Sequence, residues 1–421
     1  MWPDRRTRTI ALTALAALAA SAAGAQLLPQ GSLGRTLGPV GGVAEQVLGS
    51  AASLGKGLAA DVRALADARL DRLRGLVRAN PDALEMTQLG PAVRGEILAV
   101  DPSQATLDAA AKAGFAVLRD ETIEGLGIRS VTLKAPRGLS VERATARLRR
   151  LAPGGEFAPN HLHLQSGSEG ESHPGDAELA RGGGGAAAIG IIDGGVAAHP
   201  SLGGVEQRGF VAGAPAPSAH GTAIASLAIG QGSVRGAAPG AGAIVADVYG
   251  RDPKGGNAVA IARALGFLVE RRVQVVAMSL VGPPNPLVAK AIGRAMASGI
   301  HVVAAVGNDG PAAPPAFPAS YKGVIAVTGV DGRKRPLLEA GRSLHLDFAA
   351  PGADMAAAAP GGGLRPVRGT SYAVPLVAGR LARASLPALR AEAQDLGPKG
   401  PDKYYGRGLV CGECRTPISK K

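Results

Sequence analysis

The sequence predicts an α/β protein: a doubly wound, mostly parallel sheet over residues 187–395, preceded over residues 93–165 by a smaller ferredoxin-like βαββαβ unit. Three observations lead to this prediction. Apolar segments of strand character alternate with helical stretches in the longer region. The elements of the shorter region follow the order of a two-layer plait. A polar, glycine-rich linker at 166–186 separates the two regions.

The first 25 residues have the composition of a secretory signal peptide. Arg5 and Arg6 precede an apolar run over residues 10–20, and small residues lead to Ala25, where we expect cleavage. The alternative is an uncleaved anchor, although this run is short for a bilayer span. The sequence therefore predicts export, to the periplasm or the extracellular space, with no stable membrane anchor.

Residues 26–92 are low in complexity at first and helical later. Residues 26–55 are rich in Gly, Ala and Ser. From Lys56 to Ala79, apolar residues recur at helical spacing, with charged residues between them. This pattern predicts an amphipathic helix that ends at the Asn80-Pro81 pair.

The βαββαβ unit is read from the alternation and capping signals of six segments. In order, these are a strand at 96–100, a helix at 103–114, strands at 115–121 and 128–134, a helix at 140–151 and an extended stretch at 156–164. RNA-recognition modules share this order, but they stack bases on aromatic residues of their central strands. Phe115 is the sole aromatic residue of the two central strands. The net charge of +13 is spread along the chain, so we expect a solvated basic surface and no nucleic-acid partner.

The larger region contains five apolar strands with helices between most of them. The strands are expected at 186–192, 243–249, 273–280, 300–306 and 323–330, and the main helices at 257–271 and 286–298. This alternation is typical of a parallel sheet covered on both faces. In such sheets, functional groups gather at the carboxyl ends of the strands.

Four polar residues stand at strand or helix ends in this region. Asp193 follows the first strand, His220 precedes a small-residue helix, Asn308 follows a later strand, and Ser371 begins the last long helix. Each has an ordinary interpretation, such as a helix cap for Ser371 or a turn for Asn308. Together they supply a nucleophile, a base, an orienting carboxylate and an amide donor for an oxyanion. Gly369 would let a substrate backbone approach closely.

Seven motifs in residues 187–390 resemble those of the subtilisin-like serine peptidases. They are IIDGG, HGTAIAS, MSLVG, AAVGNDG, FPASY, AAPG and GTSYAVPLVAG. The resemblance implies a catalytic triad of Asp193, His220 and Ser371, with Asn308 in the oxyanion hole. It also implies that substrate backbone pairs with Ser279, Leu280, Val281 and Gly282, beside Ala305 and Gly307.

The resemblance further implies that the unit at 93–165 is a propeptide, which blocks the cleft until it is removed. We expect self-cleavage between about His163 and Gly185, and the alternative is a permanently attached domain. The chain departs from the family at three positions. Gly194 stands where Thr or Ser is usual, Val281 where Gly is usual, and Tyr372 where Met is usual.

The sequence therefore predicts an exported, monomeric serine endopeptidase, made as a zymogen, that hydrolyses protein or peptide substrates through an acyl-enzyme. The alternative is a catalytically silent subtilase fold used as a binding module. We expect an uncharged pocket for the residue before the scissile bond. We expect no cofactor and no metal, since residues 229–241 lack acidic ligands for calcium. In the tail at 396–421, Cys411 and Cys414 are expected to form a local disulfide.

Overall fold

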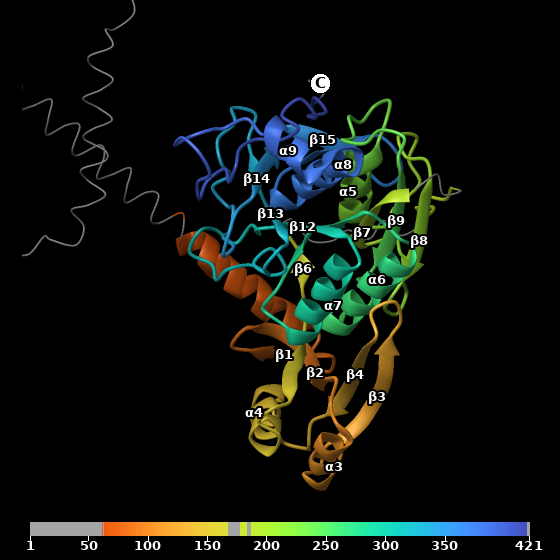
Figure 1. Cartoon of the computed structure of the whole chain (residues 1–421), viewed down its shortest axis with the longest axis vertical. Helices are drawn as coiled ribbons and strands as arrows, with labels where there is room; N and C mark the ends of the chain where they lie inside the picture. The colour runs from red at the N-terminus through yellow and green to blue at the C-terminus, as the bar shows by residue number, and fades with distance from the viewer. Residues whose placement is uncertain (1–60, 62, 167–176, 183–186, 419–421) are drawn as a thin grey trace, which may run out of the picture. The chain divides into compact units, whose positions relative to one another are not determined.

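The computed structural model describes residues 61, 63–166, 177–182 and 187–418, all within one compact unit that begins at Asp61 (Figure 1). The expected signal peptide at 1–25 and the expected low-complexity stretch at 26–55 lie outside the described residues.

A seven-stranded parallel sheet organises the larger region, in the order β14-β13-β12-β10-β7-β9-β8. The strands are β7 (Ala187–Asp193), β8 (Val205–Gly209), β9 (Gly242–Asp247), β10 (Val275–Met278), β12 (His301–Ala305), β13 (Ile325–Val330) and β14 (Phe348–Pro351). The five predicted strands are present. The edge strands β8 and β14 were not predicted, because neither has a long apolar run.

Side chains that alternate along each strand enter two separate cores. Ile191 packs on the face covered by α5 (Ala219–Ile229) and α8 (Val374–Arg383). Ile192 packs on the opposite face, under α6 (Ala258–Glu270) and α7 (Pro286–Ala297). The doubly wound arrangement predicted from the sequence is therefore found (Figure 1).

The N-terminal region forms an antiparallel five-stranded sheet with two helices. Its elements are β1 (Leu84–Thr87), β2 (Gly90–Val100), α3 (Gln104–Lys112), β3 (Ala116–Ile123), β4 (Ile128–Lys134), α4 (Val141–Leu151) and β5 (Glu156–His161). Ser103 and Ser140 cap the two helices by accepting backbone N–H groups. The six predicted elements occur in order, and β1 is an additional strand.

The second face of this sheet packs on helices α6 and α7. Leu98, Ile123 and Ile128 are buried in the same apolar cluster as the side chains of these helices. Two ion pairs flank the cluster: Lys290 Nζ lies 2.7 Å from Asp101 Oδ2, and Arg263 Nη2 lies 2.5 Å from Glu121 Oε2. Apolar burial flanked by two ion pairs therefore joins the N-terminal sheet to α6 and α7.

Terminal segments pack on both sheets. The predicted amphipathic helix is present over residues 63–79, and its Leu76 and Val77 pack against the small cluster of Leu84, Val93 and Leu162. At the other end, α9 (Leu386–Glu392) precedes a tail that pairs with β14 through Leu409. The described part of the chain contains no helix that is long and apolar enough to cross a membrane.

Candidate active site

Asp193 and His220 form a buried pair at the carboxyl end of β7. The Asp193 side chain is fully buried, and its two carboxylate oxygens lie 2.9 and 3.0 Å from His220 Nδ1. The sequence suggests that His220 precedes the helix. In the structure it lies inside the first turn of α5. The reason is that Ser218 caps the helix by accepting the Gly221 N–H. A proton on Nδ1 of His220 satisfies Asp193 and leaves Nε2 free to accept one.

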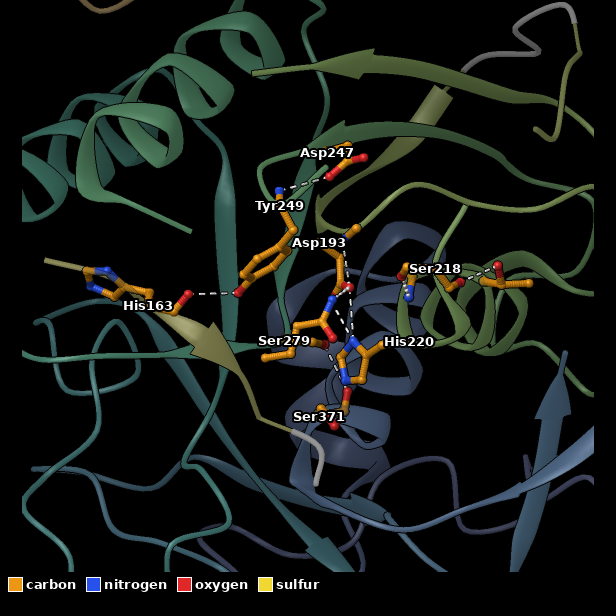
Figure 2. A network of polar contacts seen from close by, with 12 residues as sticks. His163, Asp193, Ser218, His220, Asp247, Tyr249, Ser279 and Ser371 are labelled. Carbon is orange, nitrogen blue, oxygen red and sulfur yellow. Dashed lines mark hydrogen bonds and ion pairs between the residues drawn. The ribbon is translucent and has the colours of Figure 1, made fainter. Parts of the chain in front are cut away.

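Ser371 lies in the short 3₁₀-helix η1 (Thr370–Tyr372), and the long helix α8 begins only at Val374. Its hydroxyl is buried and has no hydrogen-bond partner, so it does not cap a helix. The ring of Tyr372 packs 5.3 Å from that of His220, and Figure 2 shows Ser371 below His220. His220 Nε2 is also buried without a partner. The Ser371 hydroxyl and His220 Nε2 are therefore both available to interact with a substrate.

Asn308 follows β12, and hydrogen bonds at both ends of its side-chain amide fix its orientation. The Thr370 N–H donates to Asn308 Oδ1 at 2.8 Å, so the amide Nδ2 turns the other way and donates to the carbonyl oxygen of Ser166. Gly369 makes room for this contact. Its φ is +142°, and a Cβ at this position would lie 2.8 Å from Asn308 Nδ2 and 3.3 Å from the Ser166 oxygen.

Residues 162–166 lie in the cleft as an added strand. In this segment, β6 (Leu164–Gln165) pairs antiparallel with β11 (Leu280–Val281), and the Ser166 N–H donates to Ser279 O at 3.1 Å. On the other side, the His163 N–H donates to Gly256 O at 2.8 Å. The strand at 279–282, which the resemblance implies pairs with substrate backbone, therefore pairs here with residues 164–166 of the same chain.

Three contacts in this region were not found from the sequence. Tyr249 donates its hydroxyl to the His163 carbonyl at 2.9 Å (Figure 2). Gln165 Nε2 donates to Asp193 Oδ1 at 3.1 Å. Asp247 accepts the Tyr249 N–H at 2.9 Å, and burial raises the pKa of its carboxyl group. Asp247 ends β9, just as Asp193 ends the neighbouring β7. The expectation that functional groups gather at the carboxyl ends of strands could therefore have identified Asp247 as well.

A cavity of about 140 Å³ lies beside Ser166. Its lining includes Val281, Gly282, Gly307, Asn308, Asp309 and Ala316. Three charged side chains, those of Asp309, Arg69 and Arg72, also line this cavity. The uncharged pocket for the residue before the scissile bond stays a prediction. Leu280 and Ala305 do not line this cavity, since their side chains are completely buried in the cores on either side of the sheet.

The helix at 63–79 contacts the same loop through charged groups. Arg69 Nε lies 2.9 Å and Arg72 Nη2 2.5 Å from the Asp309 carboxylate. Leu65 lies beside Gly310. The N-terminal helix therefore touches the loop that carries Asn308.

Potential metal ligands come together at one place in the described ranges. Cys411, Glu413 and Cys414 are near one another, but the two sulfurs form the predicted disulfide. In the loop at 229–241, the Arg235 N–H donates to Thr416 Oγ1, which ties the loop to the C-terminal tail.

Comparison with known proteins gives consistent matches for the larger region. The family model of the subtilase family matches residues 184–392. Subtilisin BL of Lederbergia lenta is 30% identical over 246 residues, which cover 54% of this chain and 90% of the relative. Subtilisin DY of Bacillus licheniformis is 32% identical over 241 residues, with 53% and 88% covered.

A solved structure extends the likeness of fold. Fervidolysin from Fervidobacterium pennivorans, a keratinolytic enzyme related to subtilisin, aligns with 79% of this chain and 62% of its own at a TM-score of 0.60. Its sequence identity of 19% supports similarity of fold alone.

Two buried histidines, His161 at the end of β5 and His163 in the strand at 162–166, make stability dependent on pH. Burial lowers the pKa of His161 to about 4, and burial with the nearby His161 lowers the pKa of His163 to about 3. An unfolded chain protonates both near 6.5, so it binds more protons than the folded chain below that pH. We expect the intact chain to lose about 2 kcal/mol of stability for each histidine between pH 7 and pH 5. Urea unfolding at the two pH values measures this loss.

In the same measurement, His163→Leu should show a smaller loss between pH 7 and pH 5 than the wild type. His301→Leu is the control, because His301 is exposed. An unchanged pH dependence in His163→Leu would contradict the assignment.

The charged contact of the N-terminal helix can be tested by removing its two guanidinium groups. We expect Arg69→Gln combined with Arg72→Gln to increase hydrogen exchange over residues 63–79. The effect should be modest, because ion pairs with exposed partners contribute at most about 1 kcal/mol. The combination of Arg63→Gln and Arg78→Gln removes two exposed charges from the same helix that do not reach Asp309, and it should leave the exchange unchanged.

Proposed function

The chain belongs to the subtilase family and is a serine endopeptidase; on this premise we propose that Asp193, His220 and Ser371 form its catalytic triad. The distances of 2.9 and 3.0 Å between His220 Nδ1 and the Asp193 carboxylate support the pairing of base and orienting group. The unpartnered Ser371 hydroxyl, beside a base whose Nε2 is also unpartnered, supports the nucleophile.

The proposed reaction proceeds through an acyl-enzyme. Ser371 Oγ attacks the scissile carbonyl carbon while His220 Nε2 accepts the hydroxyl proton, and Asp193 stabilises the resulting imidazolium. The imidazolium then protonates the leaving amine as the C–N bond breaks. Water, deprotonated by His220, hydrolyses the ester and regenerates Ser371.

Asn308 is the proposed donor to the oxyanion, together with the backbone N–H of Ser371 in η1. The observation that carries this assignment is the hydrogen bond from Asn308 Nδ2 to the Ser166 carbonyl. Because Thr370 fixes the other end of the amide, the donor is already oriented before the charge develops.

The same hydrogen bond supports a zymogen cleaved by its own active site. We propose that the bond after Ser166 is cut, which narrows the range of His163 to Gly185 expected from the sequence. The N-terminal sheet would then remain as a noncovalent inhibitor, since it packs on α6 and α7 through buried apolar side chains. We also propose export directed by residues 1–25, which lie outside the described residues, and protein or peptide substrates.

Replacing the nucleophile tests both parts of the proposal. We expect Ser371→Ala to lose casein cleavage and to stay uncut after Ser166. For subtilisin, a relative, removal of the nucleophile costs on the order of 10⁶-fold in kcat. Casein hydrolysis and intact mass measure the two effects. Ser233→Ala is the control, because Ser233 is an exposed serine in the loop at 229–241.

Casein cleavage by Ser371→Ala at the wild-type rate would refute the triad. Identical processing of Ser371→Ala and wild type, each purified alone, would refute cleavage by the chain's own site.

Replacing the oxyanion donor should affect turnover more than binding. We expect Asn308→Ala to lower kcat by about 10²–10³-fold, as for the corresponding donor of subtilisin, with little change in KM. Titration with a serine-directed phosphonate gives the concentration of competent sites. A kcat per site equal to that of the wild type would exclude Asn308 from the oxyanion hole.

A further inference from the structure

Gln165, in the strand at 162–166, reaches the carboxylate of Asp193. Its backbone position is fixed by pairing with Leu280 in the antiparallel β6–β11 ladder. From there the side chain extends into the cleft, and Nε2 donates to Asp193 Oδ1 at 3.1 Å. If Ser166 precedes the scissile bond, Gln165 is the second residue before it.

Asp193 depends on donors of this kind because its carboxylate is completely buried. Besides Gln165, the Gly194 N–H donates to Oδ1 at 2.7 Å and His220 Nδ1 lies within 3.0 Å of both oxygens. A buried carboxylate is costly unless its lone pairs are satisfied. The amide of Gln165 supplies the one donor that does not belong to the catalytic region itself.

The neighbouring glycine leaves space for this amide. A Cβ at Gly194 would lie 3.3 Å from Gln165 Nε2 and 2.5 Å from Ser218 Oγ. At this position the chain carries no hydroxyl that could donate to Asp193. Residue 194 therefore supplies no side-chain donor to Asp193, and the Gln165 amide can reach the carboxylate from the cleft.

We propose that this site selects substrates with glutamine as the second residue before the scissile bond, since the glutamine amide donates a hydrogen bond to the buried carboxylate of Asp193. The inference rests on the proposed function. A methionine fills the same space without donating, and a glutamate brings a second negative charge to Asp193. A lysine donates, but its charge competes with the imidazolium that Asp193 must stabilise.

Peptides that copy residues 162–170 provide the direct test, with Gln, Met, Glu or Lys at the position of Gln165. We expect kcat/KM on the wild-type protein to be highest for Gln. It should fall about tenfold or more for Met, since hydrogen bonds to charged groups are worth this much, and further for Glu. Lys should also fall below Gln. A Met or Lys peptide cleaved as well as the Gln peptide would overturn the inference.

A second arm does not depend on activity. In the full-length Ser371→Ala chain, Gln165→Met should speed hydrogen exchange over residues 162–166. Gln104→Met makes the same chemical change on the exposed surface of α3 and should not. If the wild type cleaves no peptide, the proposed function fails. The exchange arm then decides whether Gln165 holds Asp193, and equal exchange in the two variants overturns the inference.

Discussion

The buried carboxylate of Asp193 is the constraint on which the cleft depends. A charge without exposure to water must be surrounded by donors, and here these come from three separate elements. The end of β7 gives a backbone N–H, α5 gives the imidazole of His220, and β6 gives the amide of Gln165. All three elements therefore contribute donors to Asp193 while residues 162–166 occupy the cleft.

The parallel sheet explains why these elements meet. Because all seven strands run the same way, the ends of β7, β9 and β12 bring Asp193, Asp247 and the Asn308 loop to one edge. The α5 and η1 segments approach that edge from one face, carrying His220 and Ser371. The edge also leaves backbone groups of β11 unpaired by the large sheet, and β6 adds to them as an extra strand.

Much of this arrangement could be predicted from the sequence, because apolar runs and strand ends are local signals. They predict five of the seven strands of the large sheet and the six expected elements of the N-terminal unit, and they place Asp193 and Asn308 at strand ends. Contacts between distant segments left no such signal. The donation by Gln165 depends on the register between β6 and β11, which no local pattern states. Asp309 was overlooked because its role in the pocket depends on a cavity closed by the helix at 63–79.

Two kinds of force hold the N-terminal region against the larger one, and they respond to different conditions. The sheet rests on α6 and α7 through apolar side chains, and added salt does not weaken such burial. The helix at 63–79 reaches the cleft through two guanidinium groups on Asp309, partly open to solvent. The Debye length falls from about 8 Å at physiological ionic strength to about 3 Å at about 1 M salt, which is close to the 2.9 and 2.5 Å of these two contacts. High salt concentration should therefore weaken the contact between the helix at 63–79 and Asp309. The apolar contact of the N-terminal sheet with α6 and α7 should persist under the same condition.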